Sequence, residues 1–351
     1  MKKNNSFLLV WLFIFLSGCI EPINLNIEEE PEHLVVDGVI TNEPGPITVK
    51  LSLSAPYASY TGEFSSLVRK ATVIISDDKG QSETLVENKP GIYITSGQGL
   101  QGQIGNTYTL TIKTREGKQY TSTPELLAPV PEIINLYTEV KEQKILNASG
   151  NLEKVYNLAV YIDTPDPAES KNYYLWQWEG IYRVSTQPWD YKEKVRGVLV
   201  PKPKPCCQVC WVTEFTNRVN VQDDRLINGK ELKRHLITQI PINERTFESK
   251  YHLEVKQASI SEAAYDYWNM LKTQTTNVGN IQDPSPAIIT GNILNVNDPG
   301  EIALGYFGAS AVSKKTIEIK REELGLTLGE LIFPDDCRVL SRSTTEKPVF
   351  W

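Results

Sequence analysis

Apolar and polar residues alternate along the first third of the chain. The segment ITVKLSLS (residues 47–54) carries an apolar side chain at every second position, and the same period returns in residues 73–75 and 108–112. A period of two is typical of half-buried β-strands, and clusters of Gly, Pro, Asn and Asp mark the turns between them. The pattern of about seven short strands predicts an antiparallel immunoglobulin-like β-sandwich over residues 34–125.

A proline-rich segment, LLAPVPE (residues 126–132), predicts a domain boundary, because each proline stiffens the chain and removes a backbone donor. Beyond it, we expect residues 132–351 to form a larger β-rich α+β domain. Its clearest strands are predicted at residues 155–163, 172–185, 301–312 and 314–321. The predicted fold class is therefore mainly β.

Two local features of this second region carry specific expectations. A helix is predicted over residues 259–274, because Ser259 and Glu262 have the spacing of a capping box and apolar residues follow at helical spacing. Gly305 and Gly308 interrupt the strand at 301–312, where they predict a bend or the close approach of another backbone.

The N-terminus has the pattern of a secretion signal. Lys2 and Lys3 precede an apolar run of about ten residues, which is shorter than the roughly 20 that a spanning helix needs, and LSGC (residues 16–19) follows at once. This pattern predicts a signal peptide over residues 1–18 and lipidation of Cys19; the alternative is an ordinary cleaved signal with an incidental cysteine. Residues 19–33, which include three consecutive glutamates, are expected to form a flexible tether. Acyl chains on Cys19 would then hold the protein on a membrane, outside the cytoplasm.

Four cysteines remain, namely Cys206, Cys207, Cys210 and Cys337. An even number outside the cytoplasm favours disulfides over a zinc site or a thioredoxin-like redox pair. Neighbouring Cα atoms lie about 3.8 Å apart across a trans peptide, which is below the usual disulfide spacing, so we expect Cys206 and Cys207 not to bond to each other. One local bond within residues 206–210 and one long bond to Cys337 are predicted, and the pairing within the cluster is left open.

Charge and motifs exclude several classes of function. The net charge of −7 moves to near −9 when Lys2 and Lys3 leave with the signal peptide, and an acidic surface argues against a nucleic-acid partner. The chain has three histidines in separate segments and lacks the common hydrolase, metalloprotease and phosphate-binding signatures. No catalytic residue, metal or cofactor is therefore predicted.

An aromatic cluster is the one feature that suggests ligand binding. Tyr174, Trp176 and Trp178 occupy alternate positions of one predicted strand and would share a face of it. Exposed, they could form a stacking platform for a glycan or a peptide; buried, they would fill the core of the second domain, which is the interpretation we favour.

Several segments, in this order, resemble a known family. They are CIEP (residues 19–22), LVVDGVITNEPGPITVKLS (34–52), CCQVCW (206–211), DPSPAIITGNI (283–293) and LGYFGAS (304–310). They are similar to the Bacteroidota lipoproteins grouped as domain of unknown function 4249. The resemblance implies an outer-membrane lipoprotein, on the periplasmic or cell-surface face, often encoded beside a TonB-dependent receptor. It implies no catalytic residues.

The sequence thus predicts a non-enzymatic, membrane-anchored accessory or binding subunit, and the resemblance implies that it works with a TonB-dependent outer-membrane receptor in nutrient uptake. The alternative is an extracytoplasmic degradative enzyme, a glycan or peptide hydrolase of an uptake system. An enzyme should show a cleft where an acid and a second polar catalytic group converge. A binding module should show exposed aromatic residues without such a pair.

Overall fold

The computed structural model describes residues 31–55, 66–276 and 288–351, and these residues are mainly β, as the alternation predicts. The first sheet contains ten strands in the order β3-β4-β5-β2-β1-β19-β18-β7-β6-β8. Because β3 also pairs with β6, nine of these strands close on themselves, and we call this closed sheet the ring. The strands of the first sheet are β1 (Leu34–Thr41), β2 (Thr48–Leu53), β3 (Thr72–Asp77), β4 (Ser82–Lys89), β5 (Ile92–Ile94), β6 (Thr107–Lys113), β7 (Gln119–Ser122), β8 (Glu125–Leu126), β18 (Thr290–Asn295) and β19 (Ile302–Ser310).

The ring differs from the predicted immunoglobulin-like sandwich. Its wall is one continuous hydrogen-bonded sheet rather than two separate sheets, and β18 and β19 come from near the other end of the chain. β19 pairs in parallel with β1, from Val35 opposite Leu304 to Thr41 opposite Ser310. Alternation identifies strands and their buried faces but not their partners, so the sequence between residues 34 and 125 could not reveal that its sheet is completed from outside.

Glycines permit the closest approach in the ring. Gly305 has a φ of +87°, and a Cβ at this position would overlap the carbonyl oxygen of Val36 on the paired strand. A Cβ on Gly291 of the neighbouring segment would overlap the carbonyl oxygen of Gly305 itself. Three backbones therefore meet at Gly305, which confirms the close approach predicted there.

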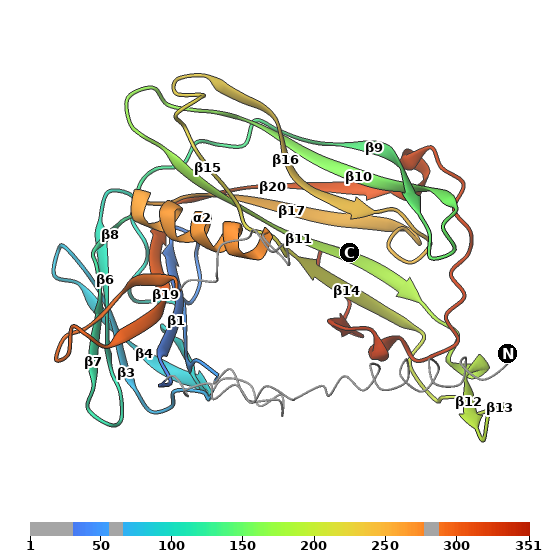
Figure 1. The fold of residues 1–351 in the computed structure, drawn as a ribbon, viewed down its shortest axis with the longest axis horizontal. Helices are drawn as coiled ribbons and strands as arrows, with labels where there is room; N and C mark the ends of the chain where they lie inside the picture. Colours follow the sequence, from blue (N-terminus) through green and yellow to red (C-terminus); the bar gives the residue numbers. More distant parts are fainter. Residues whose placement is uncertain (1–30, 56–65, 277–287) are drawn as a thin grey trace, which may run out of the picture.

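The second part of the molecule consists of two packed sheets (Figure 1). One sheet contains β9 (Asn135–Leu146), β10 (Leu152–Pro165) and β16 (Glu231–Pro241). The other contains β11 (Tyr173–Ser185), β14 (Val209–Phe215), β15 (Asn220–Asp223), β17 (Lys250–Ser259), β20 (Val312–Lys320) and β21 (Ser343–Thr344). A buried apolar cluster lies between them, with residues such as Val160 and Ile162 from the first sheet and Leu253 and Val255 from the second.

Short elements complete the described chain. They are the 3-10 helices η1 (Pro188–Asp190), η2 (Arg321–Leu324) and η3 (Cys337–Val339), and the separate hairpin of β12 (Lys192–Val195) and β13 (Val198–Pro201).

The helix α2 (Glu262–Thr276) lies between the ring and the two packed sheets of the second part of the molecule (Figure 1). It begins three residues later than predicted, because Ser261 rather than Ser259 caps it. The Ser261 hydroxyl accepts a hydrogen bond from the backbone N–H of Ala264, as an N-cap residue does. Ser259 instead joins two strand ends, since its hydroxyl donates to the Ala128 carbonyl and accepts from the Ala311 N–H.

Replacing Gly305 tests how strongly the ring depends on the close approach of three backbones at this residue. We expect Gly305→Ala to lower the free energy of unfolding by about 2 kcal/mol or more, because it adds both an unfavourable φ and a steric overlap. Gly308→Ala is the matched control, since its Cβ would meet nothing nearer than 3.9 Å. Urea denaturation of the two variants gives the comparison, and equal stability of both would show that the approach at Gly305 is not a constraint.

Candidate functional site

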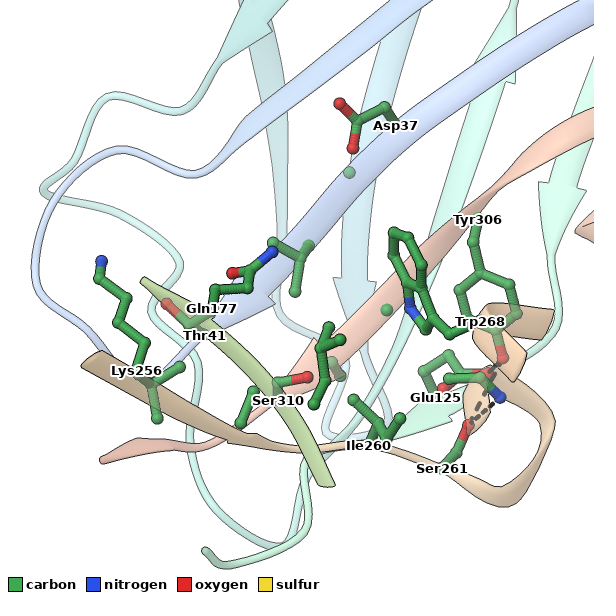
Figure 2. A pocket seen from close by; sticks show the side chains of 18 of the residues that line it. Asp37, Thr41, Glu125, Gln177, Lys256, Ile260, Ser261, Trp268, Tyr306 and Ser310 are labelled. Carbon is green, nitrogen blue, oxygen red and sulfur yellow. Dashed lines mark hydrogen bonds between the residues drawn. The ribbon is translucent and has the colours of Figure 1, made fainter. Parts of the chain in front are cut away.

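A cavity of about 280 Å³ lies where the ring, α2 and the second part of the molecule meet (Figure 2). One wall is the outer face of the ring, formed by β1 and β19. The facing wall comes from β11 and β17, and α2 closes one side with Ala264 and Trp268. Strand periodicity explains the ring wall: Val36, Gly38 and Ile40 of β1 are buried, while the intervening side chains point outward.

Glu125, at the start of β8, is the most unusual polar group in this cavity. Its side chain lines the cavity although the residue is only 3% exposed. One carboxyl oxygen, Oε1, accepts hydrogen bonds from the Tyr306 hydroxyl at 2.6 Å and from the Asn292 side-chain amide at 3.3 Å. The other oxygen, Oε2, is buried and has no hydrogen-bond partner among the described residues.

Burial sets the ionisation of this group. Loss of solvation raises the pKa of the Glu125 carboxyl, and the hydrogen bonds that it accepts from Tyr306 and Asn292 oppose this effect without cancelling it. Burial likewise raises the pKa of Tyr306, so that its hydroxyl keeps the proton that it donates to Glu125. Oε2 is therefore a buried carboxyl oxygen without a hydrogen bond to any described residue; it can accept one or, when protonated, donate one.

The surroundings of Glu125 combine aromatic and polar groups. Figure 2 shows Trp268, Tyr306, Ser261 and Glu125 together on one side of the cavity. Thr41, Gln177 and Lys256 lie toward the other side. A few convergent polar groups in a mostly apolar cavity are typical of small-molecule sites.

An ionic contact joins the ring to the second part of the molecule beside the cavity. The carboxylate of Glu43 pairs with Lys314, and it also lies 3.4 Å from the Lys256 ammonium. Burial acts to raise the pKa of Glu43, but hydrogen bonds and charges from the two lysines outweigh it, so the pKa lies below its usual range. Glu43 is therefore an ionised carboxylate in an ion pair, whereas the pKa of Glu125 is raised by burial.

The groups nearest Glu125 do not assemble a hydrolytic centre. The hydroxyl of Ser261 caps α2, and its contact with the Tyr306 hydroxyl is 3.4 Å long. No histidine is among the described residues that line the cavity. Burial lowers the pKa of His235 to about 4, with a further contribution from the charge of Lys272, and its ring lies 4.0 Å from that of Trp176. His235 is thus a neutral, half-buried residue that packs on Trp176 and contacts the Asn220 side chain.

The predicted aromatic platform lies in the core instead. Tyr174 and Trp176 are 1% and 0% exposed, and Trp178 packs partly buried against the same cluster. The indole N–H of Trp176 donates to the Gln257 side chain at 2.9 Å, and the Tyr174 hydroxyl donates to Asp166 at 2.7 Å. These rings therefore fill the core of the second part of the molecule, and two of them cannot reach solvent to form a stacking surface.

The opposite face of the same strand reaches the cavity. Leu175 and Gln177 alternate with the three aromatic residues of β11, and both line the cavity. The sequence thus indicated the strand that lines the cavity, but it indicated the aromatic face rather than the face with Leu175 and Gln177. Glu125 gave no signal, because a single glutamate beside a proline-rich boundary looks like a solvated turn. Trp268 is one of the apolar residues at helical spacing that predict the helix, and such spacing indicates packing rather than a cavity.

The structure pairs the four cysteines as Cys210 with Cys337 and Cys206 with Cys207. The first bond joins Cα atoms 5.8 Å apart across 127 residues of sequence, as a long bond from the cluster to Cys337 requires. The second corrects the expectation that the neighbouring cysteines do not bond. That expectation assumed a trans peptide, whereas the peptide between Cys206 and Cys207 is cis, with Cα atoms 3.1 Å apart.

The predicted lipidation site, Cys19, lies outside the described residues, as do the signal peptide and most of the predicted tether. Among the residues that the structure describes, no helix has the length and apolar character needed to cross a membrane. In the same residues, no group of three or more His, Cys, Asp or Glu side chains could hold a metal ion.

Comparison with known proteins identifies a family. A family model described as "Domain of unknown function (DUF4249)" matches residues 20–316, which is most of the chain. No curated protein matches the chain.

The pH dependence of stability tests the environment of Glu125. Because its pKa is raised in the folded protein above the value of about 4.3 in an unfolded chain, folding takes up a proton in the window above that value. Stability therefore falls as the pH rises through this window. Glutamine does not titrate, so Glu125→Gln should gain stability relative to wild type as the pH rises.

Urea denaturation at intervals from about pH 4 to about pH 8 measures this difference. Glu153→Gln, at an exposed position of β10, is the control for a general change in charge. A difference between Glu125→Gln and wild type that stays constant over this range would contradict the raised pKa.

Proposed function

Because the chain belongs to the DUF4249 family, we propose that it is a lipid-anchored outer-membrane lipoprotein and a non-enzymatic binding subunit of a nutrient-uptake system. The signal-peptide pattern ending in LSGC (residues 16–19) supports the anchor at Cys19. The cavity beside α2 supports the binding role. The expected partner of the lipoprotein is a TonB-dependent outer-membrane receptor. This expectation rests on the family resemblance alone.

The unpartnered Oε2 atom of Glu125 is the observation that carries the binding role. A buried polar atom without a hydrogen bond costs about 1–3 kcal/mol, and a ligand that bonds to it after a small side-chain movement would recover this free energy. Trp268 and Tyr306 offer aromatic surface next to this atom, and Gln177 offers a further amide. These groups suit a small ligand with one apolar face and several hydrogen-bonding groups.

The size of the cavity limits the ligand. Its volume of about 280 Å³ lies just below the range of roughly 300–1,000 Å³ that is usual for ligand pockets. A single sugar residue or an amino acid fits this volume better than a polymer. We therefore place the ligand among the units, or the exposed end groups, of a glycan or a peptide.

A hydrolase remains the second candidate, and one observation favours it. A buried carboxyl with a raised pKa is what a general acid requires, and Glu125 is such a group. Its hydrogen-bond partners, however, are the Tyr306 hydroxyl and the Asn292 amide, so no second acid or base contacts it within the described chain. This arrangement fits recognition better than bond cleavage.

Ligand screening with cavity variants tests the proposal. The mature lipoprotein in detergent would be titrated calorimetrically with D-glucose, D-galactose, D-mannose, N-acetyl-D-glucosamine and the common L-amino acids. We expect at least one probe to bind, and Glu125→Gln and Trp268→Ala each to weaken its binding by roughly tenfold. Trp189→Ala is the matched control, because Trp189 is exposed on η1 and does not line the cavity.

Two results would contradict the binding role at this cavity. One is that no probe binds; the other is that binding survives both cavity variants unchanged. Cleavage of p-nitrophenyl glycosides or of peptides, lost in Glu125→Gln, would support the hydrolase instead.

A further inference from the structure

The hairpin formed by β12 and β13 (residues 192–201) stands apart from the rest of the fold. The two strands pair only with each other among the described strands, and they project from the end of the molecule far from the ring (Figure 1). Arg196 and Gly197 form the turn with φ values of 49° and 88°, the positive angles that a two-residue hairpin turn favours. The hairpin is thus well formed although no core covers it.

One face of the hairpin carries three solvent-exposed valines beside the ion pair of Glu193 and Lys202. Val195 lies opposite Val198, and Val200 lies opposite Glu193, so the three valines share a face. Their exposed fractions are 46%, 65% and 44%, and Leu199 on the other face is 62% exposed. Four adjacent aliphatic side chains are exposed on this projection, where they contribute nothing to a core. They indicate a surface that contacts something outside the fold.

The charge of this segment contrasts with that of the whole chain. Residues 188–204 contain five basic and two acidic side chains, while the protein carries a net charge of −7. Lys202 pairs with Glu193, but Lys192, Lys194 and Arg196 form no ion pair with any described residue. Aliphatic side chains flanked by free cations are complementary to a bilayer interface that carries anionic headgroups.

The base of the hairpin is fastened to the C-terminal segment. The backbones of Gln187 and Phe333 are joined, since the Gln187 N–H donates to the Phe333 carbonyl at 2.9 Å and the Phe333 N–H donates to the Gln187 side chain at 2.7 Å. Lys204 pairs with Asp335 on the other side of the hairpin. The Cys210–Cys337 disulfide lies just beyond, so the hairpin is presented on a cross-linked support.

We propose that this hairpin is a second membrane contact, which inserts its aliphatic side chains into the interface of a bilayer containing anionic lipids. The valines and Leu199 enter the acyl boundary, and Lys192, Lys194 and Arg196 meet the headgroup phosphates. With the lipid anchor proposed at Cys19, on which this step rests, the protein would have two separate contacts with the membrane. Together they orient the protein on the membrane, which a single flexible tether does not do.

Vesicle co-sedimentation tests the hairpin independently of the lipid anchor and of the cavity. The mature chain with Cys19→Ser, which cannot be acylated, would be mixed with vesicles of phosphatidylethanolamine and phosphatidylglycerol (3:1) or of phosphatidylcholine alone. We expect it to bind the anionic vesicles, and added salt to weaken this binding. The double variant Val198→Asp/Leu199→Asp should reduce the bound fraction by at least about fivefold, because each aspartate adds a repelled charge and removes an inserting group.

A matched control separates membrane contact from a general effect of added charge. Val86→Asp/Leu226→Asp makes the same kind of change at positions that are 68% and 89% exposed elsewhere on the surface, and it should bind as the Cys19→Ser parent does. Thermal unfolding of both double variants verifies that each is folded. Absence of binding to anionic vesicles, or equal binding by the hairpin variant and its control, would overturn the proposal. Loss of a co-purifying protein in the hairpin variant, without vesicle binding by the parent, would overturn it in favour of a protein partner.

Discussion

The parallel pairing of β1 with β19 is the contact on which the architecture depends. It joins residues near the start of the described chain to residues about 270 positions later, and it completes the wall of the ring. The same pairing turns Tyr306 toward α2 and places Phe307 in the ring core. Without it, the ring would be open and the cavity would lack the wall that holds the hydroxyl bonded to Glu125. Fold and candidate site therefore share one long-range constraint, which three closely approaching backbones at Gly305 make possible.

The sequence predicted local structure well and long-range partners poorly, for physical reasons. Period-two alternation correctly indicated the strands, because it reports which face of a strand is buried. It does not report the identity of the neighbouring strand, so closure by β18 and β19 was missed. Ser259 has the spacing of a cap, but its hydroxyl bonds to Ala128 and Ala311, and Ser261 caps the helix instead. Cis peptides are rare, so a trans peptide was assumed and the Cys206–Cys207 bond was not predicted from the sequence.

The candidate site was harder to predict than the fold. Aromatic residues drew attention to β11, yet Trp176 is held in the core by Gln257, and the cavity receives Gln177 from the other face. Glu125 becomes distinctive only through burial, which depends on segments far away in the sequence. The cavity and the exposed hairpin lie at different ends of the second part of the molecule (Figure 1). Contact of the hairpin with a bilayer would thus leave the cavity open to ligand.

Amide hydrogen exchange of the mature protein tests the central claim that β1 and β19 form one cooperative unit. If β19 is an integral wall of the ring, the amides of residues 34–41 and 304–310 should exchange with the same opening free energy. They should also lose their protection together as denaturant is added. Rapid exchange of residues 304–310, while residues 34–41 keep their protection, would contradict it. That result would mean that the N-terminal strands fold without β19, as an independent sandwich would.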